Sequence, residues 1–196
     1  MSEIDVIDHL VGIAPGSRLD AVRAQRQQAR DNAQASYRAL FQPDDISQVT
    51  LAERYALAVF VAGLHHQTNV AGYYETGLAK HATPAIETAL HAEIIAGAGT
   101  GPYGHYPKGP LTPEDTTGPT FRVSTASRAA LGPRLAAALE HAHMLVFHPR
   151  DAAPPHLQSL LDAGWSTTGI VTLSQLVAFL AFQIRVVFGL RALAAA

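Results

Sequence analysis

Residues 49–80 read VTLAERYALAVFVAGLHHQTNVAGYYETGLAK, and this stretch decides the fold. Thr50 followed three residues later by Glu53 is the pattern of a capping box at the start of a helix. An apolar run from Tyr55 to Leu64 comes next, and a helix that is apolar nearly all round belongs in the middle of a helical core. We therefore expect a central helix that ends in the polar cluster HHQTN, residues 65–69, beside a pocket.

The composition limits the classes of function. The chain has 196 residues, enough for a single domain with a sizeable core. A net charge of −2 suggests neither a nucleic acid nor an anionic membrane as partner. The charged fraction is 15 %, against about 25 % for a typical soluble domain, so we expect a homo-oligomer. The N-terminus lacks an apolar signal core, and we expect a cytoplasmic protein.

The absence of cysteine is the strongest single exclusion. It removes disulfides, thiol catalysis and thiolate metal sites. We also expect no cofactor and no metal, because no pair of histidine and acidic residues in the sequence completes a ligand set.

Turn and cap signals divide the rest of the chain into further helices. No run shows the alternation of a strand, so the fold class is all-α with one domain over 1–196. We expect helices at 3–12, 17–41, 84–95, 127–147, 154–164 and 166–190. The segments are an N-terminal helical part (1–44), a core (45–95), an irregular arm (97–120) and a C-terminal helical half (125–191).

The arm, 97–120, repeats glycine and proline every few residues, so no regular element fits. Connections this long usually serve as lids, as mobile loops or as arms that wrap a partner. Tyr103, His105 and Tyr106 alternate with glycines, and we expect them to order the arm against the body or a neighbouring subunit.

The last long helix has almost no polar face. Gln183 and Arg185 nevertheless fall inside it, and a charge near the middle of a helix is costly in lipid. We therefore interpret it as a core helix that does not span a membrane. Its stripe of small residues follows a three–four spacing that predicts close approach of another helix; the stripe is Thr167, Ser174, Ala178, Ala181 and Arg185.

At this point the chain resembles a family. Residues 161–190, LDAGWSTTGIVTLSQLVAFLAFQIRVVFGL, look like the C-terminal signature of AhpD-like, peroxidase-related proteins of the carboxymuconolactone decarboxylase superfamily. The central stretch is similar to the core motif of the same family, and the resemblance covers about 45–95 and 125–191. It implies an AhpD-like helical domain and a peroxidase-related family label.

This sequence departs from the redox motif of that family at most of its positions. Glu53 matches its glutamate, but His65 and Thr68 stand where its CxxC cysteines would fall. Its histidine would fall at Ala71 or Gly72. We therefore expect no reduction of hydroperoxides with a dithiol donor. The superfamily also has a cysteine-free branch that works by proton transfer, and the histidine of that branch would fall near Tyr73.

The remaining hypothesis is acid–base chemistry on a small molecule, with Glu53 as acid and His65 or His66 as base, and with Thr68 beside them. On one straight helix Glu53 and His65 would be about 18 Å apart. We therefore predict that the helix breaks at Gly63 and folds back. The bland alternative makes Glu53 a cap or a structural ion pair and the histidines a helix-end cap and a surface residue. Alternative functions are a peroxidase-related antioxidant protein and a non-catalytic oligomeric scaffold or partner.

Overall fold

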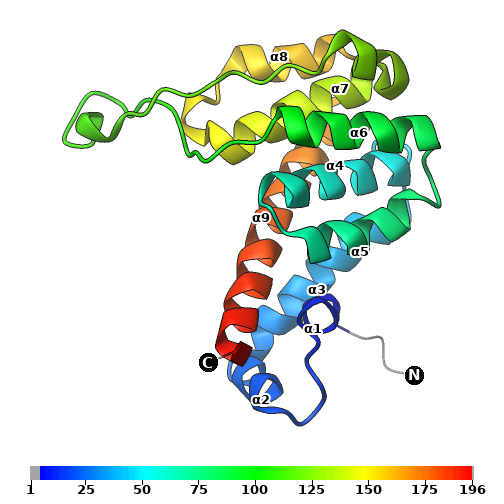
Figure 1. Cartoon of the computed structure of the whole chain (residues 1–196), viewed down its shortest axis with the longest axis vertical. Helices are drawn as coiled ribbons and strands as arrows, with labels where there is room; N and C mark the ends of the chain where they lie inside the picture. Colours follow the sequence, from blue (N-terminus) through cyan, green and yellow to red (C-terminus); the bar gives the residue numbers. More distant parts are fainter. Residues whose placement is uncertain (1–4, 196) are drawn as a thin grey trace.

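The structure is a computed structural model that describes residues 5–195, and these residues form an all-α fold (Figure 1). The fold class is therefore confirmed. The helices are α1 (Val6–Val11), α2 (Arg18–Ala24), α3 (Gln27–Phe41), α4 (Leu51–Leu64), α5 (Thr68–Leu78), α6 (Pro84–Ala96), α7 (Thr125–Phe147), α8 (Pro154–Asp162) and α9 (Thr167–Ala195), with short 3-10 turns η1 (Thr112–Glu114) and η2 (Pro149–Asp151). The first two residues of the helix predicted at 3–12 lie outside the described residues.

Helix α4 begins where the sequence predicts. The hydroxyl of Thr50 accepts from the backbone N–H of Glu53 at 3.2 Å, and Glu53 Oε2 accepts from the N–H of Thr50 at 2.8 Å. This reciprocal capping box satisfies two donors that the first helical turn leaves free. The start of α9 is fixed in a similar way, because Ser166 Oγ accepts from the N–H of Gly169 at 3.0 Å.

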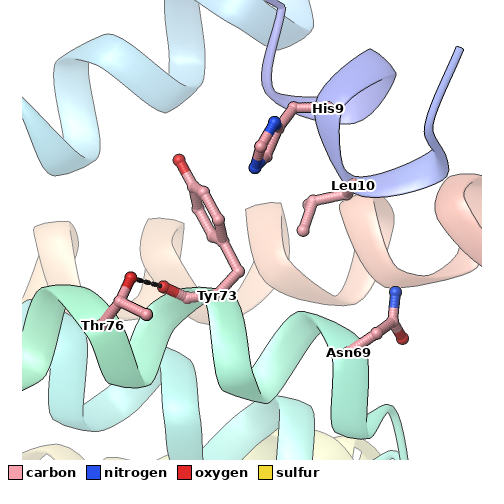
Figure 2. A pocket seen from close by; sticks show the side chains of 5 residues that line it. All are labelled: His9, Leu10, Asn69, Tyr73 and Thr76. Atoms are coloured by element: carbon pink, nitrogen blue, oxygen red, sulfur yellow. Dashed lines mark hydrogen bonds between the residues drawn. The ribbon is translucent and has the colours of Figure 1, made fainter.

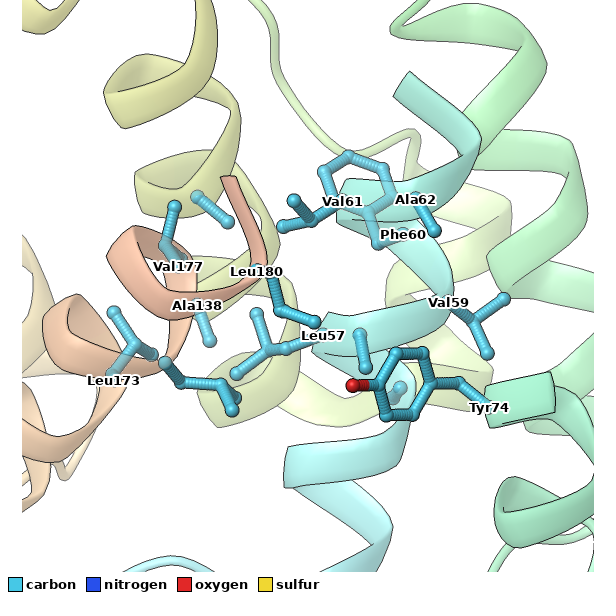
Figure 3. Close-up of a cluster of buried hydrophobic side chains, with 14 of the residues drawn as sticks. Leu57, Val59, Phe60, Val61, Ala62, Tyr74, Ala138, Leu173, Val177 and Leu180 are labelled. Carbon is cyan, nitrogen blue, oxygen red and sulfur yellow. The ribbon is translucent and has the colours of Figure 1, made fainter. Parts of the chain in front are cut away.

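The core is built around α4. Its side chains from Ala56 to Ala62 are fully buried. Figure 3 shows Leu57 and Val61 of α4 facing Leu180 of α9, with Tyr74 of α5 on another side. Burying a side chain such as Leu57 contributes about 2 kcal/mol, so this helix alone supplies a large part of the hydrophobic stabilisation.

Two glycines allow neighbouring helices to approach α4 closely. A Cβ added at Gly77 would lie 2.2 Å from the ring of Tyr55, and one added at Gly63 would lie 2.7 Å from the side chain of Ile94. Gly63 is thus a contact position against α6 inside an unbroken helix. The prediction that the helix breaks at Gly63 is therefore wrong.

The N-terminal helices differ from the prediction of one helix over 17–41. The chain turns between α2 and α3 at Arg26, whose φ of −126° and ψ of 54° are not helical. Arg23, which is 8 % exposed, binds Asp5 and Asp8, and Arg30 also binds Asp8. This ion-pair cluster holds α1, α2 and α3 together below the main body (Figure 1).

Helix α9 runs from the main body down to the N-terminal helices (Figure 1). It is long and apolar enough to cross a bilayer by length and composition, and half of its most apolar window is buried inside the protein. The core helix of a soluble protein passes the same test of length and composition. The half-burial is consistent with the interpretation of α9 as a core helix.

The arm is irregular, as predicted, and only its base packs on the body. The N–H of Tyr103 donates to Phe147 O at 2.6 Å, and the N–H of His105 donates to Asp151 Oδ1 at 3.1 Å. Gly104 and Thr116 form a single antiparallel bridge. Residues 107–114 are exposed throughout and project away from the helices (Figure 1), so the tip does not pack on the body, and its packing against a neighbouring subunit stays a prediction.

Candidate functional site

Glu53 does not meet the polar cluster that follows α4. The residue is 9 % exposed, and besides the capping box its carboxylate accepts from Arg134 Nε of α7 at 2.6 Å. Glu53 lies in the first turn of α4 and His65 at its C-cap, about 18 Å away at 1.5 Å per residue. The predicted pairing of Glu53 with a histidine is therefore wrong, and Glu53 is a structural cap and ion-pair partner.

The fold-back itself is present, between His65 and Gln67. His66 has a φ of 55°, in the left-handed region, and this single residue reverses the chain into α5. The reversal leaves His66 exposed, while His65 is half-buried. Thr68 is the first residue of α5 and is also exposed. Of the predicted site residues, only His65 faces the cavity described next.

This cavity, here called the His65 pocket, has a volume of about 230 Å³ and opens between the C-terminal ends of α4 and α7 and the middle of α9. It is lined by His65, Leu145, Val146, Ser174, Val177, Ala178, Ala181 and Arg185. Four of the five residues in the predicted small-residue stripe line this cavity. Helix α7 does approach the stripe at Ser174, whose Oγ lies 3.3 Å from His141 Nε2, whereas the small side chains of Ala178 and Ala181 leave a space.

The orientation of His65 is fixed by the turn that precedes it. Its Nδ1 lies 2.8 Å from Val61 O, and a carbonyl oxygen can only accept, so Nδ1 carries the hydrogen. The other ring nitrogen, Nε2, is then an unprotonated acceptor in the neutral imidazole. Burial lowers the pKa of His65, and the charges of Arg185 and His66 act in the same direction. At neutral pH His65 is therefore a neutral base.

Arg185 is the one charged side chain among the described residues that line this pocket. One of its nitrogens donates to Ala181 O at 2.7 Å, which folds the side chain back along α9. Among the residues that the structure describes, no acidic one lines the pocket to balance this cation. A guanidinium next to an apolar cavity is suited to a carboxylate, because its planar fork matches the two oxygens.

Ser174 of α9, which lines the pocket, is hydrogen-bonded to His141 of α7, which does not. Ser174 Oγ lies 3.3 Å from His141 Nε2, and it donates to Ile170 O at 3.0 Å. His141 is 6 % exposed, and burial lowers its pKa to about 4. No pattern in the sequence links these two residues, since residues 33 positions apart give no local signal.

A wider cavity of about 400 Å³ lies between α1 and α5 (Figure 2). His9, Asn69 and Tyr73 line it, together with Leu10 and Thr76. The Tyr73 hydroxyl is already bonded to that of Tyr37 at 2.6 Å, and Asn69 Nδ2 is sealed from solvent. Its polar atoms are therefore less available to a ligand than those of the His65 pocket.

No family model, curated protein or solved structure matches this chain. The resemblance to AhpD-like proteins therefore rests on the sequence pattern alone and stays a prediction. The assignment of the site accordingly depends on the geometry of the His65 pocket.

Proposed function

We propose that the protein is a cysteine-independent enzyme that performs acid–base chemistry on a small carboxylate in the His65 pocket. The observation that carries the proposal is the joint presence of His65, an oriented neutral imidazole, and Arg185, a cation with no acidic neighbour in the lining. A largely apolar cavity with a few convergent polar groups is the usual form of a small-molecule site.

Each of the two residues has a defined role. Arg185 binds the carboxylate of the substrate, and His65 Nε2 removes a proton from the bound molecule and later returns it. The bound carboxylate also offsets the charge of Arg185, one of the causes that lower the pKa of His65. Substrate binding therefore raises that pKa and makes the imidazole a stronger base when it is needed.

The test uses two probes, 3-phenylpropanoate for binding and 2-oxo-3-phenylpropanoate for proton exchange with deuterated water. We expect Arg185→Gln to weaken binding of 3-phenylpropanoate at least tenfold by calorimetry, as loss of a charge-assisted hydrogen bond does. We expect His65→Gln to keep the binding and lower the enzyme-catalysed exchange about 100-fold or more by proton NMR.

Arg191→Gln is the matched control, since Arg191 is exposed on the same helix outside the pocket. It should change neither quantity. Binding that survives Arg185→Gln unchanged would remove the carboxylate from the proposal. Binding without any exchange by the wild type would favour the alternative of a non-catalytic binding partner.

We also propose that the protein self-associates through the outer face of α9. Val171 and Phe182, about three helical turns apart on the same side of the helix, are 56 % and 46 % exposed there. Monomeric proteins rarely expose large apolar patches. Sedimentation should give a multiple of the 20.8 kDa chain mass at micromolar concentration, and Phe182→Asp should shift it towards the monomer. A monomeric wild type would contradict this.

A further inference from the structure

Ser174 and Arg185 lie at two ends of the His65 pocket along α9. Because Arg185 folds back onto Ala181 O, its guanidinium lies near residue 181. Seven residues separate 174 from 181, about 10 Å along a helix axis. A molecule that touches both groups must therefore be about 10 Å long, and the apolar side chains Leu145, Val146 and Val177 line the same pocket.

The hydrogen bonds of Ser174 decide what it can offer to such a molecule. Its one proton is donated to Ile170 O, so it must accept from His141 Nε2, which carries the hydrogen. In this tautomer His141 Nδ1 carries no hydrogen, and that atom is buried without a hydrogen-bond partner. A buried unpaired acceptor is more readily tolerated than a buried unpaired N–H.

Ser174 is consequently an acceptor towards the pocket. A hydroxyl oxygen has two lone pairs, of which His141 occupies one. The other is free for a donor from a ligand. The pocket thus presents a cation at one end and an acceptor at the other, with apolar walls in its lining.

We propose that the substrate is a carboxylic acid with a hydroxyl group about 10 Å from its carboxylate across an apolar body, and that Ser174 selects this hydroxyl. His141 is a positioning residue, because it holds Ser174 as an acceptor without touching the ligand. This inference rests on the proposed function and narrows its substrate class. A volume of about 230 Å³ is below that of sites for drug-sized molecules, so the body is a single ring with a short chain.

The experiment compares 3-(4-hydroxyphenyl)propanoate with 3-phenylpropanoate, which differ only in the hydroxyl. Calorimetry on the wild type should show 3- to 10-fold tighter binding of the hydroxylated probe, the size of one net hydrogen bond. Ser174→Ala should abolish this preference, so that the two probes bind with equal affinity. Ser174→Thr keeps the oxygen and should keep the preference.

Thr172→Ala is the control on the same helix. Thr172 donates to Thr168 O as Ser174 does to Ile170 O, but it does not line the pocket. It should leave the preference intact. Nitrogen-15 NMR of His141 gives a readout that packing alone would not produce, namely a protonated Nε2 and a bare Nδ1 in the native protein.

Every outcome bears on one of the two proposals. Equal binding of both probes by the wild type overturns selection by Ser174 and leaves the carboxylate site standing. A preference that survives Ser174→Ala, or a protonated Nδ1 on His141, also overturns it. If neither probe binds, the carboxylate site and the substrate class fail together.

Discussion

Replacing Arg134 by alanine should lower the free energy of unfolding by about 3 kcal/mol, the cost of breaking a partly buried charge pair. The Arg134 side chain donates to three different segments: Glu53 Oε1 at 2.6 Å, Gly164 O at 2.8 Å and Gln48 O at 2.5 Å. It also stacks on Trp165 at 4.0 Å. Its removal leaves Glu53 as a largely buried carboxylate with only the Thr50 cap.

Thermal unfolding measures this effect. For a chain of this size about 3 kcal/mol corresponds to a fall in Tm of about 9 °C. Arg134→Lys should recover only part of it, because an ammonium cannot reproduce the planar fork. The exposed Arg191→Ala is the control and should change Tm little. A loss no larger in Arg134→Ala than in this control would contradict the assigned role.

Replacing Glu53 by glutamine distinguishes a structural role of this residue from a catalytic one. Glu53→Gln should reduce Tm, because it removes the charge that faces Arg134. Measured well below its Tm, this variant should keep the proton exchange of the wild type, since the carboxylate lies at the opposite end of α4 from His65. Loss of exchange in a folded Glu53→Gln protein would restore the original acid–base pair.

The comparison of sequence with structure shows which signals are local. The capping box at Thr50, the cap at Ser166 and the irregular arm follow from neighbouring residues, and each is found where it was predicted. Their physics acts within one turn of chain, so a short pattern is enough to recognise them.

The error over Glu53 has a geometric cause. When the chain reverses between α4 and α5, the residues of the turn lie at the C-terminal end of α4. The N-terminal end of α4 instead packs against the end of α5, about one helix length further along the chain. Tyr55 accordingly stacks on His81, with ring centroids 5.7 Å apart, and packs against Gly77. A sequence pattern can locate the turn after α4, but the length of α5 decides which residue then lies beside the first turn of α4.

The His65 pocket could be predicted only in part. The half-buried His65 follows from its place after an apolar run, but its neighbours come from α7 and α9, more than 75 residues away. Non-local packing decides whether small residues such as Ala178 meet another helix or line a space. A stripe of small residues therefore has two outcomes, and its spacing does not distinguish them.

Acid should destabilise the protein through His141. Burial places its pKa at about 4, below the value near 6.5 of an unfolded histidine, and the charge of His156 adds to the effect. Below pH 6.5 the unfolded chain therefore binds a proton at this histidine that the native state does not bind. The contribution of neutral His141 to the free energy of unfolding is fully present above pH 6.5 and is lost as pH falls towards 4. One such group removes about 2 kcal/mol between pH 7 and pH 5. Burial also lowers the pKa of His143, which adds to the loss.

Denaturant unfolding at pH 7, 6 and 5 tests this, with His141→Leu as the variant that cannot titrate. The change in unfolding free energy from pH 7 to pH 5 should be about 2 kcal/mol smaller in His141→Leu than in the wild type, whatever the absolute stability of the variant. His91→Gln, at an exposed position on α6, should retain the full acid loss. An unchanged pH dependence in His141→Leu would show that the native state protonates His141 as readily as the unfolded chain does, and would contradict the lowered pKa.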